Sequence, residues 1–314
     1  MKQRSNIALR CACSLVVLSL ISGCGSKIQT RPPQHTTLKV LFLAGQIKVL
    51  SAAFQRALSA QLPEVDVQFR EMFNSLDSLK ALQSGDADLT FVLADLAYLA
   101  FIGEIDGNRY DRLRGVAILD PSPIFLAVRR NSSIHTVEDL RNRRLNLGLP
   151  RNSPALTGES LLNAVGIKAT LSYELPGVAA PQLANGTLDA SLLPGLFPLK
   201  RALIHDTRIL SLSPDTVGRV HRAYPFIRGV VVPANILGVP ILTIAVDRVL
   251  VCRSGLDERL VFAVAKSLFG GMMDLSLINA PLRQMNVEDA PATPIPLHEG
   301  AARYYRTEAA MEDR

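Results

Sequence analysis

Apolar residues follow two alternating patterns along the chain from Leu38 onward. A short, mostly apolar run at 38–43 is typical of a strand buried on both faces, and further strands are predicted at 65–69 and 88–93. Between them, apolar residues recur at helical spacing, as at Leu76, Leu79 and Leu82. Strands that alternate with helices at such short intervals predict an α/β fold with mostly parallel sheets flanked by helices.

The second half of the chain repeats this alternation. The stretch 136–167 predicts a short helical turn, a strand at 144–149, a loop, and a helix that carries Leu161, Leu162 and Val165 on one face. The same patterns predict strands at 170–175, 189–193, 208–212 and 241–252, helices at 178–185 and 257–269, and an irregular segment at 224–240.

Two segments of the chain echo each other. LKALQSGDADLTFVLAD and APQLANGTLDASLLPG share the order of helix, glycine turn and Asp-flanked strand. This repetition predicts two similar lobes that face one another across a cleft. We expect lobe 1 to comprise 38–121 and 241–314 and lobe 2 to comprise 122–240, with the first crossing near Pro121 and Pro123.

The N-terminal segment has the features of a secretion signal. A basic start precedes the apolar run 11–21, which is shorter than the roughly 20 residues that span a bilayer. Ile21-Ser22-Gly23-Cys24 resembles the bacterial lipobox, whose cysteine thiol takes a diacylglyceryl group. We therefore expect a signal peptide over 1–23, a lipid on Cys24 that anchors a periplasmic protein to a membrane, and a flexible tether over 24–37. A plain cleaved signal is the alternative.

Charge and cysteine content narrow the classes of partner. The chain has 34 basic and 28 acidic residues, and loss of Lys2, Arg4 and Arg10 with the signal would halve its net charge of +6. So small a surplus, without Trp or a Lys/Arg-rich block, argues against a nucleic-acid partner. Once Cys11 and Cys13 leave with the signal and Cys24 carries lipid, Cys252 has no partner, so we expect it to be reduced and buried.

Motifs of enzymatic chemistry are missing from the sequence. The five histidines have no metal-binding spacing, and there is no GxSxG, GxxxxGK[ST] or GxGxxG. We therefore expect no catalytic residue, no metal and no cofactor. His298 is expected to cap the last helix.

Several phrases together resemble one family. The order of the lipobox, GDADLTFVLAD, TVEDLRNRRLNLGLP, NGTLDASLLPG and HEGAARYY is similar to that in the TAXI-type solute-binding subunits of TRAP transporters. Binding proteins of sulfonate and thiamine-precursor ABC importers share the middle phrases, and the terminal HEGAARYY favours TAXI. The resemblance implies a type II periplasmic binding protein fold, with a hinge between its lobes. Such a protein closes on a small organic acid or amino acid and delivers it to integral-membrane permease subunits.

Two departures from this family fall in the expected pocket. Ala44-Gly45-Gln46-Ile47-Lys48 replaces a Gly-rich loop that contains Tyr, and Arg151-Asn152-Ser153 replaces a small GSG. They imply either a different ligand or a partly filled pocket. Two other functions therefore remain open, which are an enzyme on the same fold and an orphan surface lipoprotein that acts through protein contacts.

Candidate binding residues stand where predicted strands end and helices begin. Free N–H groups at a helix start favour anionic or carbonyl oxygens, and open α/β sheets bind ligands beyond the carboxyl ends of their strands. Arg151 could hold a carboxylate bidentately, or be an exposed loop arginine. Ser153 is expected to cap the helix that follows it, whereas Asn152 and Thr157 could cap this helix or contact ligand oxygens.

The remaining candidates also have two interpretations. Asn74 and Ser75 are expected to cap a helix and could also contact ligand. Asp95 could accept from a ligand amine or cap the next helix, and Phe197 could wall the cleft or pack in the core. The full predicted ligand-binding set is Gly45, Gln46, Asn74, Ser75, Asp95, Arg151, Asn152, Ser153, Thr157, Gly195 and Phe197.

Overall fold

One mixed sheet runs through the part of the chain that the computed structural model describes, which is residues 36–43, 54–56, 58–59, 62–195, 206–270 and 288–312. Its ten strands are β1 (Thr36–Leu43), β2 (Val65–Met72), β3 (Leu89–Leu93), β4 (Leu113–Arg129), β5 (Arg144–Asn146), β6 (Thr170–Ser172), β7 (Ala190–Pro194), β8 (Thr207–Ile209), β9 (Ile227–Val232) and β10 (Ile241–Arg253). The helices are α2 (Ser75–Ser84), α3 (Ala94–Ile102), α4 (Ser153–Val165), α5 (Pro176–Asn185), α7 (Pro214–Ala223), α8 (Ala234–Leu237), α9 (Glu258–Gly270) and α11 (Glu299–Glu312), with a 3-10 turn η1 (Glu138–Leu140).

The strand order is symmetric about the centre of the sheet. It runs β2-β1-β3-β10-β4-β7-β5-β6, with β8 beside β4 and β9 beside β10. Pairs among the outer strands are parallel, whereas every pair that includes β4 or β10 is antiparallel. The predicted α/β class is therefore confirmed, and the sheet is mixed because two long strands run against their neighbours.

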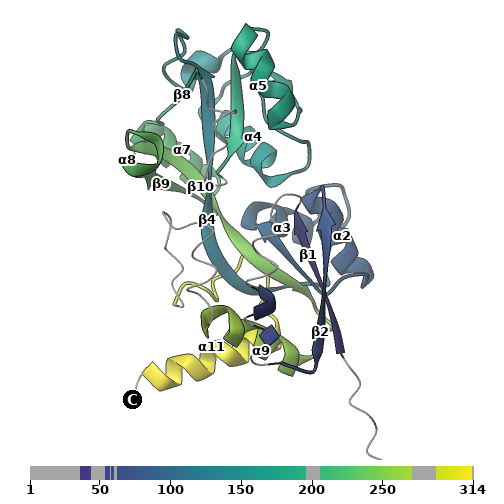
Figure 1. Ribbon diagram of the computed structural model, residues 1–314. Helices are drawn as coiled ribbons and strands as arrows, with labels where there is room; N and C mark the ends of the chain where they lie inside the picture. The colour runs from purple at the N-terminus through teal and green to yellow at the C-terminus, as the bar shows by residue number, and fades with distance from the viewer. Residues whose placement is uncertain are drawn as a thin grey trace, which may run out of the picture. The chain divides into compact units, whose positions relative to one another are not determined.

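The strands β4 and β10 connect the two halves of the sheet, as Figure 1 shows. Two apolar stretches were expected on either side of Pro121 and Pro123, but β4 is one strand of 17 residues. It pairs with β10 up to Pro123 and with β7 from Ile124 onward. The prolines, which lack a backbone donor, thus lie where β4 exchanges one neighbour for the other. The lobe boundaries themselves stay a prediction.

The two echoing segments fold into the same local structure. Asp88, before β3, accepts a hydrogen bond from the N–H of Lys39 in β1 at 2.8 Å, and Asp189, before β7, accepts one from the N–H of Arg144 in β5 at 2.9 Å. An arginine side chain binds each carboxylate as well, Arg253 at Asp88 and Arg144 at Asp189. The repeated phrase therefore encodes a clamp that fixes each of these strands to its neighbour.

Apolar side chains of the described residues form three clusters. One, which contains Phe42, draws only on residues between 38 and 119 and between 250 and 304, and another, which contains Phe125, draws only on residues between 125 and 241. The third includes residues of both halves, such as Leu79 and Leu161, and α3 packs against α4 there. Each half thus has apolar packing of its own, and the two also share a core.

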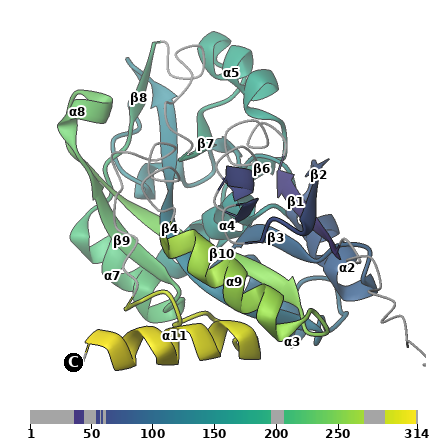
Figure 2. The ribbon, with the colours of Figure 1, turned by 60° about the horizontal axis from the view of Figure 1, so that its bottom comes forward.

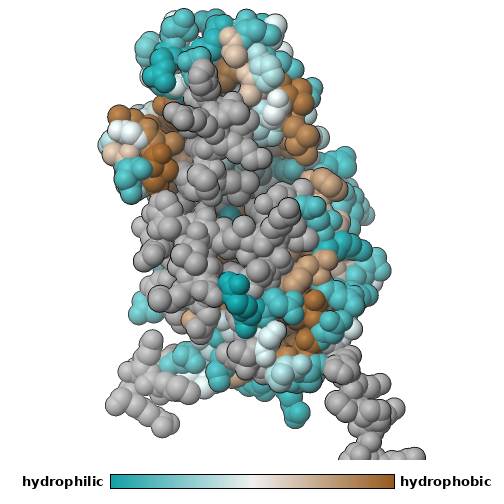
Figure 3. Space-filling view, viewed as in Figure 1, coloured by the Kyte–Doolittle hydropathy of each residue, from teal (hydrophilic) through white to brown (hydrophobic). Residues whose placement is uncertain are grey.

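The segment 224–240 is more regular than expected. It forms β9, which pairs antiparallel with β10, and the short helix α8, which ends at Gly238 in the left-handed region with φ 85°. The sequence predicted an irregular segment here because Pro225, Pro233 and Pro240 are typical of turns. Figure 3 shows an apolar surface over α8, and Val231 and Val239 nearby are exposed.

The C-terminal helices complete the half that contains β1. Figure 2 shows α11 alongside α9, and the two helices pack together. The predicted cap is present, because His298 Nδ1 accepts a hydrogen bond from the N–H of Gly300 at 3.1 Å. Cys252 is buried as expected, and burial raises the pKa of its thiol. The expected signal, Cys24 and the tether up to 35 lie outside the described residues. None of the described helices is long and apolar enough to cross a membrane.

Candidate functional site

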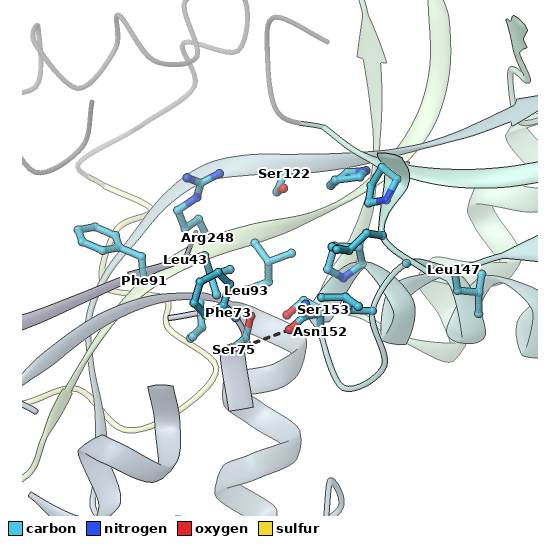
Figure 4. Close-up of a pocket in the computed structure, with 17 residues that line it drawn as sticks. Leu43, Phe73, Ser75, Phe91, Leu93, Ser122, Leu147, Asn152, Ser153 and Arg248 are labelled. Carbon is cyan, nitrogen blue, oxygen red and sulfur yellow. Dashed lines mark hydrogen bonds between the residues drawn. The ribbon is translucent and has the colours of Figure 1, made fainter. Parts of the chain in front are cut away.

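A cavity of about 280 Å³ opens at the carboxyl ends of the parallel strands. Its walls come mainly from residues at or just after the ends of β1, β2, β3, β5, β6 and β7, with further residues from β4 and β10 (Figure 4). This is where ligands of open α/β sheets are expected. The described lining residues are Leu43, Phe73, Ser75, Phe91, Val92, Leu93, Ser122, Leu147, Gly148, Leu149, Asn152, Ser153, Pro154, Leu175, Pro176, Pro194 and Arg248.

Two helix starts meet at this cavity, those of α2 and α4. Asn74 caps α2 through its side-chain oxygen, which accepts from the N–H of Leu76 at 2.8 Å. The next residue, Ser75, donates its N–H to Oδ1 of Asn152 at 3.1 Å. Asn152 is the N-cap of α4, but with this bond made its side chain does not cap its own helix. One amide therefore connects the two helix starts, and Figure 4 shows this bond.

Ser153 is the first residue of α4 and lines the cavity. It was expected to cap the helix, but Asn152 occupies the N-cap position and Ser153 follows it. The residue is 2% exposed, and its Oγ makes no hydrogen bond to a described residue, although it lies near enough to Asp95 to lower the pKa of that carboxyl. A buried hydroxyl without a partner costs free energy, so this atom is suited to meet a ligand.

Asp95 and Thr157 bind each other behind the cavity wall. Thr157 Oγ1 lies 2.9 Å from Oδ2 of Asp95, and Oδ1 of Asp95 accepts from the N–H of Leu96 at 2.7 Å. Burial raises the pKa of Asp95 to about 6, against the opposing effect of these hydrogen bonds. Of its two alternatives, Asp95 does not act as the N-cap of α3, because the helix begins one residue earlier and Leu93 takes the N-cap position. Neither Asp95 nor Thr157 is among the lining residues.

Arg248 is a lining residue that the sequence analysis missed. It lies in β10 opposite Leu93 of β3, next to a register shift in the pairing with β4 that separates Asp247 from Val249. Bulges of this kind redirect side chains and are common beside binding sites. The residue is 6% exposed, and its Nε lies 3.5 Å from Oδ1 of Asp120. A basic residue within the apolar run 241–252 was the signal available in the sequence.

The other predicted residues lie away from the described wall or outside the described part. Arg151 is exposed, adopts the left-handed region with φ 60°, and does not line the cavity. Gly195 donates its N–H to the carbonyl of Pro123 at 2.7 Å, and an added Cβ would overlap that carbonyl oxygen, so the glycine permits close packing beside the cavity. Gly45, Gln46 and Phe197 are outside the described residues.

The site is mostly apolar. Its described wall combines apolar side chains with three serines, one asparagine and one arginine. Among the described residues, no group of three or more His, Cys, Asp or Glu side chains could hold a metal ion.

Comparisons with known proteins agree with this architecture. The model of the NMT1-like family matches residues 49–308. The structure is similar to that of XAC2383 from Xanthomonas citri bound to ATP, with 14% identity over 88% of this chain and 96% of that one and a TM-score of 0.53. A substrate-binding protein of an amino acid ABC transporter has 14% identity, coverage of 79% and 100%, and a TM-score of 0.50. The predicted fold of periplasmic binding proteins is thereby confirmed.

Proposed function

The chain belongs to the NMT1-like family, and we propose that it is an extracytoplasmic solute-binding protein that captures a small solute and passes it to a membrane importer. The observation that carries this proposal is the cavity of about 280 Å³ at the carboxyl ends of the parallel strands. Two helix starts and one buried arginine supply its polar groups, which suits reversible binding of a small molecule.

A TRAP importer of the TAXI type is the first candidate partner, because HEGAARYY near the C-terminus resembles that family. In the structure, residues of this phrase pack the last helix, α11, against the rest of the protein. Tyr305 donates its hydroxyl to the carbonyl of Val116 at 2.9 Å, and Gly300 has no room for a Cβ against α9. The phrase therefore supports shared ancestry and carries no information on the solute.

An ABC importer is the second candidate. Its support is the fold shared with the binding protein of an amino acid ABC transporter. Reconstitution of the purified protein with each type of permease in vesicles separates the two candidates. Uptake that needs ATP in the vesicle lumen favours the ABC importer, and uptake that follows an ion gradient without ATP favours the TRAP importer.

Binding itself is tested by exposing the purified protein to cell extract and identifying the retained solute by mass spectrometry. That solute at a hundred times its Kd should stabilise the fold by about 2.7 kcal/mol, measured by urea unfolding. Ser122→Phe, which fills the cavity from β4, should abolish this gain, whereas Ser133→Phe at an exposed position should keep it. Extract that yields no solute, or a Ser122→Phe variant that folds and still binds, would contradict the proposal. Turnover of the retained solute would point to an enzyme instead.

A further inference from the structure

On the basis of the proposed function, we infer that the cavity selects an organic acid that has an apolar body and carries no amino group. Three properties of the described wall lead to this class of ligand. They are the positive character of its polar groups, the absence of a carboxylate that could pair with an ammonium group, and the apolar surface between them.

The polar groups of the wall favour negative charge. Arg248 is almost fully buried, and its contact with Asp120 at 3.5 Å is its one ion pair in the described structure. A buried guanidinium has five donors, and this one makes no hydrogen bond to a described residue, so a ligand oxygen would fill a vacant acceptor position. The start of α4 adds the positive end of a helix dipole. The first N–H groups of α2 are already bound, to Asn152 and Asn74.

Ser153 is an independent observation at the start of α4. Ser153 lines the cavity, and its buried Oγ makes no hydrogen bond to a described residue. A helix start with an adjacent unpaired hydroxyl can donate to a carboxylate or sulfonate oxygen. In Figure 4, Arg248 and Ser122 lie on one side of the cavity, and Ser75, Asn152 and Ser153 lie on the other.

An ammonium group would find no strong acceptor in this wall. None of the described lining residues is acidic. Asp95, the nearest candidate from the sequence, lies behind the wall with both oxygens hydrogen-bonded, and the side-chain oxygen of Asn152 already accepts from Ser75. A cation buried without a partner is strongly disfavoured, so an amino acid should bind much more weakly than the same acid without its amine.

The rest of the wall suits a hydrocarbon body. Leucines from four different segments, Leu43, Leu93, Leu149 and Leu175, line the cavity together with Phe73. Phe73 is 75% exposed and Leu175 is 53% exposed, so both retain apolar surface that a ligand could cover. The cavity of about 280 Å³ has room for about nine waters at about 30 Å³ each. An acid of about six carbons would displace most of them.

Matched ligands test the inference on the wild-type protein by calorimetry. Hexanoate is compared with norleucine, which adds only the amine, and with hexanamide, which removes the charge. Phenylacetate and phenylglycine form a second pair, and hexanesulfonate replaces the carboxylate by a sulfonate. We expect each acid to bind at least about a hundredfold more tightly than its amino or amide counterpart. Affinity should rise about fourfold per methylene from butanoate to hexanoate, or about 0.8 kcal/mol each.

Two variants, with a matched control, test whether Arg248 and Ser153 bind the acid group of the ligand. Arg248→Gln should weaken hexanoate at least about tenfold, whereas Arg151→Gln, at an exposed arginine outside the wall, should leave it unchanged. Ser153→Ala should weaken hexanoate about fivefold and change the melting temperature little, because the hydroxyl makes no hydrogen bond to a described residue. Loss of stability in Ser153→Ala would indicate a structural role instead.

The outcomes separate this inference from the proposed function. Preference for hexanoate or phenylacetate with a loss in Arg248→Gln or Ser153→Ala supports both. If norleucine or hexanamide binds as tightly as hexanoate or more tightly, the inferred ligand class is wrong but the proposed solute-binding function stands. The same holds if only a hydrophilic solute stabilises the protein. If neither this panel nor cell extract stabilises the protein, both fail.

Discussion

Asp95 is the residue whose charge state matters most for the fold. It is fully buried between α3 and α4, and burial raises its pKa from 3.8 to about 6. Because the folded-state value lies above the unfolded one, Asp95 contributes its full stability below about pH 4, and this contribution is lost as the pH rises through 6.

Asp95→Asn should remove this pH dependence. The amide can still accept from Thr157 but cannot ionise, so the stability of the variant relative to wild type should rise by about 2–3 kcal/mol between pH 4 and pH 8. Urea unfolding at several pH values measures the difference in the free energy of unfolding between the two proteins. The titration of all other groups cancels in this difference. If the stabilities of the two proteins change in parallel with pH, burial does not raise the pKa of Asp95.

Gly195 illustrates a residue needed for its lack of a side chain. A Cβ there would overlap the carbonyl oxygen and ring of Pro123. Gly195→Ala should therefore destabilise the fold by about 1–3 kcal/mol through overpacking. Gly177→Ala is the control, because a Cβ at that position meets nothing within 4 Å. Equal stability of both variants in thermal unfolding would mean that β4 and the end of β7 can separate freely.

Part of the site could be predicted residue by residue. The rule that ligands meet helix starts after strands led to Ser75, Asn152 and Ser153, all of which line the cavity. The same rule could not exclude Arg151, because the direction of its side chain depends on a left-handed backbone that the sequence does not reveal. Arg248 was missed because a register shift in strand pairing, and no local motif, places it in the wall.

Among the elements, the clamps at the starts of β3 and β7 connect sequence and fold most directly. Both follow a helix and a glycine turn in the sequence, and both fix a strand to its parallel neighbour through an aspartate. The pKa of Asp189 is held at about 2 by its hydrogen bonds with the Arg144 side chain. Its stabilising effect is therefore present above pH 3.8 and is lost as the pH falls towards 2.

Neutralising the two clamps should have unequal effects. Asp189→Asn should cost about 1 kcal/mol at pH 7, because the Arg144 side chain is 48% exposed and water screens the pair. The deficit should shrink below pH 3.8. Asp88→Asn should cost about 3 kcal/mol, since Asp88 and Arg253 are 9% and 25% exposed. Chemical denaturation provides both values, and a larger loss for Asp189→Asn would contradict the burial argument.

Element types were more predictable than element boundaries. The alternation of apolar runs and helical stripes led to β1, β2 and β3, and to α2 between β2 and β3. It could not show that β4 passes through two prolines without a break, because that depends on which neighbour each half of the strand pairs with. The strand β9 was not predicted for the same reason, since its pairing with β10 outweighs the turn-forming residues around it.

For the whole molecule, a lipid anchor on Cys24 is the proposed attachment to the membrane. Cys24→Ala should release the protein into the soluble extracytoplasmic fraction, because the thioether needs the thiol and without it neither acyl chain of the diacylglyceryl group is attached. Cell fractionation measures this, with Cys252→Ala as the control at a buried thiol that should leave the protein in the membrane fraction. Equal fractionation of Cys24→Ala and wild type would exclude the anchor.

The central claim is that the solute binds where the parallel strands of both halves end. A crystal structure of the protein with its tightest-binding solute tests this most directly. The claim predicts electron density for the solute inside the cavity, with its oxygens at hydrogen-bond distance from Ser153 or Arg248. Solute density elsewhere on the protein, or a cavity filled by the protein's own side chains, would contradict it.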